Sequence, residues 1–133
     1  MTDFQSAVEK AIYDRLVEQV TAAPVKQHVP ENHAPPVVII GDITFENQGE
    51  KDAPLFRFDV ALVSVVTGPS RKPLNVLQAQ VRTALDRWKP AATGEVAFGE
   101  IVVSGGSGQE IQGEQGPIYF GQQSAVFYVQ GAI

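Results

Sequence analysis

The sequence contains no cysteine, one tryptophan and one methionine among its 133 residues. Without cysteine, disulfide bonds, cysteine-ligated zinc, iron–sulfur clusters and a cysteine nucleophile are all excluded. Positive charge is also scarce, because no lysine or arginine follows Lys89. The formal net charge of −5 makes the chain as a whole a poor general binder of nucleic acid.

Long apolar runs are missing as well. The longest are Pro35–Ile40 and Val60–Val66, far below the roughly 20 residues of a membrane-spanning helix. The N-terminal residues Met1–Phe4 have neither the basic region nor the apolar core of a secretory signal. We therefore expect no membrane association, and a protein that works in a cytoplasm or in something assembled there.

Apolar residues are nevertheless plentiful enough for a core. Valine, isoleucine, leucine and phenylalanine contribute 18, 8, 6 and 7 residues, together 39 of 133. That content is too high for a disordered chain, and a chain of this length can bury about two-thirds of its unfolded surface. No internal repeat or linker divides the sequence, so we expect one domain over residues 1–133.

Two segments have the three- and four-residue apolar spacing of amphipathic helices. The first runs from about Asp3 to Ala22; Thr2 and Gln5 have the spacing of a capping box, and Pro24 ends the helix. Its apolar stripe consists of Phe4, Ala7, Val8, Ala11, Ile12, Leu16 and Val20.

The second helix is expected from Arg71 or Lys72 to Trp88. Ser70 is a candidate cap, and Pro73 suits the first turn, where its missing N–H is not needed. Its apolar stripe consists of Leu74, Leu77, Val81, Ala84, Leu85 and Trp88. Core packing is the expected role of this tryptophan.

The strand candidates are rich in β-branched and aromatic residues, and the strongest is 55–67. The second half of that segment is apolar on both faces, so we expect both faces to be covered. Residues 48–54 form a polar hairpin loop, and Gly105–Pro117, with five of the twelve glycines, is expected to be a long flexible loop. The other strands are expected at 25–29, 37–45, 96–104 and 124–132, with 118–120 as an extension of the last.

The element order is therefore α-β-β-β-α-β-β. This order predicts the α+β class, with two helices packed on one face of a mainly antiparallel sheet.

No pattern of an active site emerges. His28 and His33, on either side of Glu31, fit no helical metal motif, and Ser104–Gln109 lacks the lysine of a phosphate loop. The serines have no positioned base, and the paired carboxylates lie in polar segments. We expect no catalytic, cofactor-binding or metal-binding residues, and no enzyme activity.

Charge is distributed unevenly along the chain. Residues 1–70 carry −5, residues 71–89 carry +4, and residues 90–133 carry −4. The second helix is thus a basic segment between acidic ones. Two interpretations stay open: a solvated helix face, or a contact between unlike surfaces of neighbouring subunits, as in a ring.

The chain resembles a known family in the order of its elements. The resemblance rests on the first helix with Ala11–Leu16, on Val29-Pro30, on the strand Pro36–Gly41, and on the long strand Phe56–Val66. It continues through Ala79–Leu85 of the second helix and the final strand Gly121–Gln130. These features resemble the small tail completion or tail terminator proteins of long-tailed phages. Val37 stands where the family commonly has an aromatic residue.

The resemblance implies a subunit of a hexameric ring that caps the tail tube and offers a surface to the head connector. It implies no catalytic residues and a location in the virion tail, assembled in the bacterial cytoplasm. The expected partners are further copies of the chain, the tail tube protein and the head connector or stopper protein, with DNA passing through the lumen without specific binding. The candidate interface residues are Arg71, Lys72, Arg82, Arg87, Glu46, Glu50, Lys51, Asp52, Gln109, Glu110 and Glu114.

Two alternatives remain at this point. A head–tail connector or neck protein would share the size, the acidity and the lack of catalytic groups. A non-viral α+β domain that binds a small ligand would need a closed apolar pocket. The particle could be a phage, a prophage remnant or a gene-transfer particle.

Overall fold

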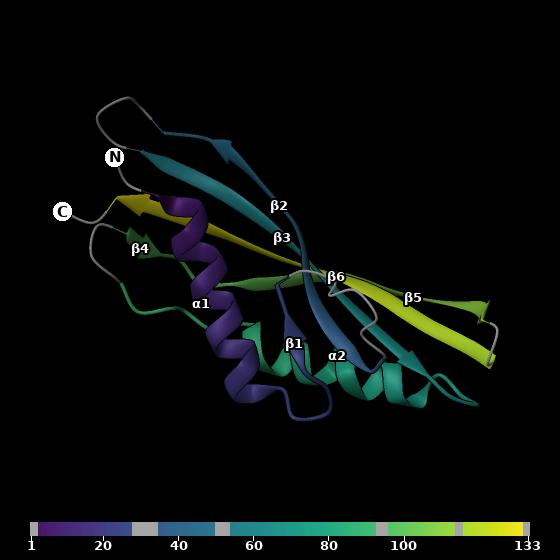
Figure 1. Cartoon of the computed structure of the whole chain (residues 1–133). Coiled ribbons are helices and arrows are strands. Elements are labelled where there is room, and N and C mark those ends of the chain that lie inside the picture. Colours follow the sequence, from purple (N-terminus) through teal and green to yellow (C-terminus); the bar gives the residue numbers. More distant parts are fainter. Residues whose placement is uncertain (1–2, 28–34, 50–53, 93–95, 114–115, 132–133) are drawn as a thin grey trace.

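A computed structural model describes residues 3–27, 35–49, 54–92, 96–113 and 116–131 (Figure 1). Within this part of the chain two helices and six strands form, which confirms the α+β class. The element bounds are α1 (Phe4–Gln19), β1 (Val25–Lys26), β2 (Val37–Asn47), β3 (Leu55–Thr67), α2 (Lys72–Leu85), β4 (Val96–Phe98), β5 (Val102–Gly113) and β6 (Gly116–Gly131).

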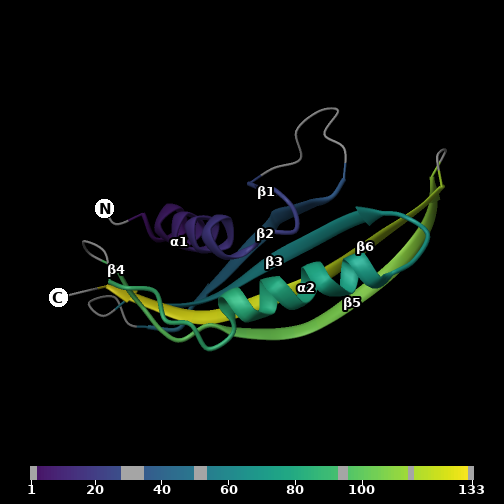
Figure 2. The ribbon, with the colours of Figure 1, turned by 90° about the horizontal axis from the view of Figure 1, so that it is seen from below.

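The six strands make one sheet with the order β1-β2-β3-β6-β4, and β5 also pairs with β6. All pairs are antiparallel except β1 with β2, which is parallel, so the sheet is mixed. Figure 2 shows the sheet as a curved surface, with β5 and β6 running along α2 and beyond it. The final strand of the sequence, β6, lies in the interior of the sheet.

The expected arrangement therefore differs from the structure in two ways. The order is α-β-β-β-α-β-β-β, because the segment expected as one strand over 96–104 is divided between β4 and β5. The expectation of both helices packed on one face of the sheet is met only in part. The sheet is curled, α1 and α2 contact each other, and α1 also contacts β1.

Helix α1 starts one residue later than expected, with Asp3 as its N-cap. The Ser6 backbone N–H donates to Asp3 Oδ1 at 2.9 Å, and this bond, with a second from the Ser6 side chain, lowers the pKa of the Asp3 carboxyl. The expected capping by Thr2 falls on a residue outside the described ones. The helix ends at Gln19, before Pro24.

Helix α2 is shorter than expected. Arg71 is its N-cap in place of Ser70, and the helix ends at Leu85. The C-cap Asp86 is already extended, with φ −65° and ψ 126°, and Arg87 after it has a left-handed φ of 68°, so the helix ends before Trp88. Trp88 still packs against the core, and the Arg15 guanidinium lies 4.8 Å from its ring centroid while Arg15 Nε donates to the carbonyl of Ala84.

The core lies between the helices and one face of the sheet. Its largest side chains include Phe58 on β3 and Phe127 on β6, which are stacked with ring centroids 6.0 Å apart. The apolar stripes of both helices reach the same cluster, as their spacing predicts. Their fully buried members are Val8, Ile12, Leu16, Leu74, Leu77, Val81, Ala84 and Leu85.

The segment expected as a flexible loop is instead paired as a strand: β5 and β6 form a hairpin arm, and β3 pairs with the other edge of β6 as far as Ile118. Residues Val102–Gly113 of β5 pair with β6 down to Gly113 opposite Gly116. The sequence did not predict this strand, because a segment rich in glycine and glutamine lacks the apolar alternation that indicates a strand. The arm extends beyond the rest of the sheet (Figures 1 and 2).

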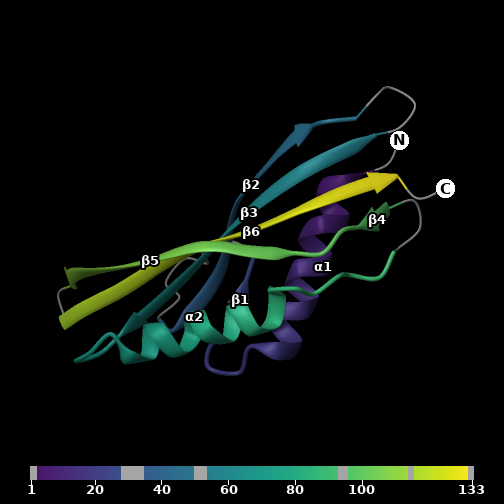
Figure 3. The same cartoon turned by 180° about the vertical axis from the view of Figure 1, so that it is seen from behind.

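The second half of β3 is covered on one face only, which corrects the expectation that both faces are covered. Val60, Leu62 and Val66 are buried, but Val63 and Val65 on the other face stay partly exposed. This outer face, seen in Figure 3, has no helix over it. Across its described residues from 61 to 67, 102 to 111 and 118 to 126, the pairing register places no charged side chain on it.

Candidate functional site

Four polar side chains lie along one face of α2, starting at its N-cap. They follow the helical spacing i, i+4, i+7 and i+11, which places them in one row. The row borders a groove of about 390 Å³ between α2 and β5. The residues of the row are Arg71, Asn75, Gln78 and Arg82.

The opposite wall of the groove is a stretch of β5 with almost no side chains, Gly106–Gly108. A Cβ on Gly108 would lie 3.2 Å from Leu74 Cδ2, so the glycine allows β5 to approach α2 closely. The pairing of β5 with β6 is irregular between Ser104 and Ser107, where β5 has one extra residue. Gln123 of β6 lies opposite this bulge.

Two glutamines join α2 to the sheet at the floor of the groove. Gln78 Nε2 donates to the Ser107 carbonyl at 2.9 Å, and Gln123 Nε2 donates to the Gln78 carbonyl at 3.1 Å. Only 2% of Gln123 is exposed, yet its Oε1 has no hydrogen-bond partner. A buried acceptor without a donor costs folding free energy.

Gly121 leaves the room that this bridge occupies. A Cβ at this position would overlap Gln78 Nε2 and the Ser107 carbonyl oxygen. Any side chain on residue 121 would therefore displace the hydrogen bond that closes the floor of the groove.

The charge of the groove is positive. Arg71 and Arg82 are exposed, and among the described residues neither takes part in an ion pair. The Arg71 guanidinium lies 5.9 Å from the Tyr119 ring centroid, in cation–π range. One acidic residue, Glu110, lies close to this end, because it is the cross-strand neighbour of Tyr119.

At the other end of the groove the acidic groups are already engaged. The Asp86 carboxylate, one turn beyond Arg82, accepts the Val103 backbone N–H at 3.0 Å. Glu100 pairs with Arg87 at 3.5 Å. Among the residues that the structure describes, the two groove arginines therefore have no acidic partner.

The structure brings together only part of the expected interface set. Arg71 and Arg82 line the groove, whereas Lys72 lines a separate apolar hollow and Arg87 pairs with Glu100. Glu46 is in β2 and not in a loop, and Gln109 and Glu110 are in β5. Glu50, Lys51, Asp52 and Glu114 lie outside the described residues, as do His28 and His33.

Sequence reasoning did not identify Asn75, Gln78 and Gln123 as site residues. The row at i, i+4, i+7 and i+11 could have indicated the first two, because a polar row beside an apolar stripe is readable from spacing. Gln123 could not be found in this way. Its importance depends on a bulge in β5, sixteen to nineteen positions earlier in the chain, and on its bond to α2.

Two other findings bear on function. No group of three or more histidine, aspartate or glutamate side chains in the described ranges gathers closely enough to hold a metal ion. Neither described helix is long and apolar enough to cross a membrane.

Comparison with known proteins gives one result at the level of the fold. No family model and no curated protein matches the sequence. Among solved structures, the chain is similar to one from the virion of a native gene transfer agent particle. The TM-score is 0.81 at 14% sequence identity, over 97% of this chain and 100% of that one. The chain therefore has, over nearly its whole length, the fold of a component of that virion.

Proposed function

We propose that this protein is a structural virion component of a phage-like particle, and specifically a tail terminator or tail completion subunit. In this role copies of the chain form a ring, a hexamer, that caps the tail tube and joins it to the head connector. The observation that carries the proposal is the likeness of fold to a chain of a gene transfer agent virion over the full length. The proposal assigns the protein no catalytic role.

Two surfaces of the chain support a role in assembly. The outer face of the sheet is partly apolar, without charge over its central part, and no helix covers it (Figure 3). The β5–β6 arm extends past the rest of the fold, with Ile111 near its tip 48% exposed. Surfaces of this kind suit contact with further subunits better than permanent exposure to water.

The acidic balance supports passage of DNA without specific binding. The chain has a net charge of −5, and its free cations on α2 lie beside a groove that can hold a protein segment. A lumen without a basic lining would not retain phosphate groups. A ring structure with Arg71, Lys72, Arg82 or Arg87 lining the pore would refute this part of the proposal.

The direct test adds the purified protein to tail tube protein from the same particle while the tubes polymerise. A terminator stops elongation, so tube length falls as its concentration rises, and electron microscopy shows a ring at one end. Native mass spectrometry of the capped complex gives the number of subunits. Tubes that grow to unchanged length, with no density at either end, would refute the proposal.

The same experiment separates the alternatives. A head–tail connector or neck protein would bind the head portal and leave free tubes unaltered. A small-ligand-binding domain would do neither, and would carry a metabolite in the mass spectrum. The apolar hollow of about 500 Å³ beside Val66, Pro73 and Val76 is the place to look for such a ligand.

A further inference from the structure

The positive groove has a complementary surface on the same chain. The part of β2 from Gly41 to Asn47 is exposed along its outer edge, because β1 pairs with β2 only as far as Ile39. This stretch contains two exposed carboxylates, Asp42 and Glu46, and no basic residue. We call it the acidic edge of β2.

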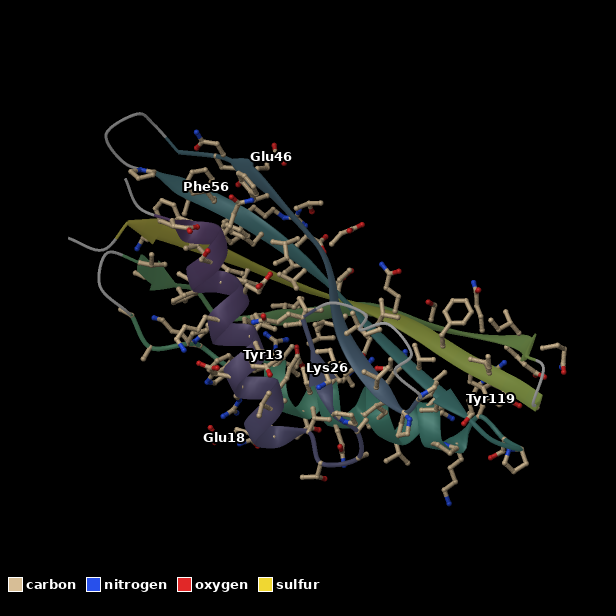
Figure 4. The ribbon with its side chains drawn as sticks, viewed as in Figure 1. Tyr13, Glu18, Lys26, Glu46, Phe56 and Tyr119 are labelled. Carbon is tan, nitrogen blue, oxygen red and sulfur yellow. The ribbon has the colours of Figure 1, made fainter. Side chains whose placement is uncertain are left out.

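Glu46 cannot reach Arg71 of its own chain. Glu46 pairs in register with Arg57, whereas Tyr119, at the groove end near Arg71, pairs with Val66. Nine residues of strand separate these positions on β3, which corresponds to about 30 Å. Figure 4 shows Glu46 and Tyr119 toward opposite ends of the molecule. Only a second copy can bring Glu46 and Arg71 together.

The spacing of the charges on the two surfaces agrees. Arg71 and Arg82 are eleven positions apart on a helical row, or about 16 Å. Asp42 and Glu46 are four positions apart on a strand, or about 13 Å. Exposed arginine side chains can span the difference, so one extended segment can meet both guanidinium groups.

We infer that the groove between α2 and β5 holds the acidic edge of β2 from a second copy of this chain. Asp42 and Glu46 of one copy then face Arg82 and Arg71 of the next. The contact is heterologous, since the two surfaces differ, and repetition of it can close a ring. This inference rests on the proposed function, for which it specifies the contact between neighbouring subunits.

The local charges do not cancel this attraction. On β3, Arg57 lies opposite Glu46 and Asp59 lies opposite Thr44. The charges of Arg57 and Asp59 sum to zero. On the groove side, Glu110 is the opposing charge near Arg71. The acidic edge therefore keeps its two negative charges and the groove keeps an excess of positive charge.

A charge-swap experiment tests the inference. The variants are Arg71→Glu with Arg82→Glu, called the groove variant, and Asp42→Lys with Glu46→Lys, called the edge variant. Self-association is measured by sedimentation velocity in low salt over a range of concentrations. Each variant alone should associate on the order of 10- to 100-fold more weakly, because two attractive pairs become repulsive. An equimolar mixture should recover association, since the reversed surfaces attract each other again.

Matched controls separate this contact from a general effect of charge. Lys10→Glu with Lys89→Glu changes the net charge as much as the groove variant does, but at exposed positions that do not line the groove. Asp14→Lys with Glu18→Lys does the same for the edge variant, on α1. The self-association constants of both controls should stay within a few-fold of that of the original protein. Circular dichroism confirms that all variants are folded.

The outcomes are distinct from those of the tube-capping test. Variants that associate as the original protein does would overturn the inference and leave the proposed terminator role intact. Loss of association in the groove variant alone would show that another segment fills the groove, which also overturns it. A chain that stays monomeric at every concentration would overturn it too. Failure to cap tubes, by contrast, refutes the proposed function.

Discussion

Replacing Gln123 by methionine should stabilise the isolated chain. The substitution keeps a side chain of similar volume and removes both polar atoms of the amide. The bond from Nε2 to the Gln78 carbonyl is lost, at a cost of about 0.5–1.5 kcal/mol. That carbonyl belongs to the interior of α2, where the helix supplies its own N–H partner.

The gain outweighs this loss. Removing the buried Oε1 without a partner relieves about 1–3 kcal/mol. The expected net effect is that Gln123→Met raises the free energy of unfolding by about 1 kcal/mol. If Gln123 served the stability of the single chain, the substitution would instead lower the free energy of unfolding. An original residue that is worse for the monomer than its substitute indicates a function outside the monomer.

Urea denaturation, followed by circular dichroism at low protein concentration in high salt, measures the monomer. Equal slopes of free energy against urea for both proteins are required for the comparison. Gln78→Met is the matched control: it removes the bond to the Ser107 carbonyl with no buried acceptor relieved, so it should destabilise by up to about 1 kcal/mol. A Gln123→Met protein less stable than the original by more than about 1 kcal/mol would refute the reasoning.

Three further predictions concern the fold. Gly121→Ala should destabilise the chain by about 2–3 kcal/mol in urea denaturation, because its Cβ would overlap the Gln78–Ser107 bridge; an unchanged midpoint would contradict this. Phe58→Ala should lower the free energy of unfolding by about 3–5 kcal/mol. Phe45→Ala, at a side chain 48% exposed, should lower it by less than half as much, and an equal decrease for both variants would contradict the assigned core. Because the pKa of Asp3 is lowered in the folded chain, the contribution of its carboxylate to stability is present above pH 3.8 and lost as the pH falls through the folded pKa. Asp3→Ala should therefore lower the melting temperature at pH 7, and the difference in melting temperature between the variant and the original protein should become smaller in acid.

The helices and the core could be read from the sequence, because apolar spacing reports directly on which side chains face inward. Leu74, Leu77 and Val81 show this for α2. The predicted ends of the helices were less accurate than the predicted core faces. Trp88 continues the spacing of its stripe, but the extended backbone at Asp86 ends the helical path first, and spacing alone gives no information on that conformation.

The extent of β5 could not be read for a different reason. Residues 105–113 have little apolar alternation, and their strand conformation depends on hydrogen bonds to β6. Such pairing is a property of the partner strand as much as of the segment itself. The groove was partly predictable, since the basic character of Arg71 and Arg82 was visible, but its floor at Gln123 was not.

The position of β6 has a consequence for how the chain is made. Thr67 pairs with Ile118 and Leu55 pairs with Gln130. The residues of β3 therefore pair with residues that lie 51 to 75 positions later in the sequence and are synthesised after them. During synthesis at about 5–20 residues per second, the 64 residues from 68 to 131 take roughly 3–13 s to appear. For that interval β3 presents a bare, apolar edge to the cytosol. Folding speed and early aggregation should therefore be governed by β6, and substitutions there should lower the yield of soluble protein even where the finished fold tolerates them.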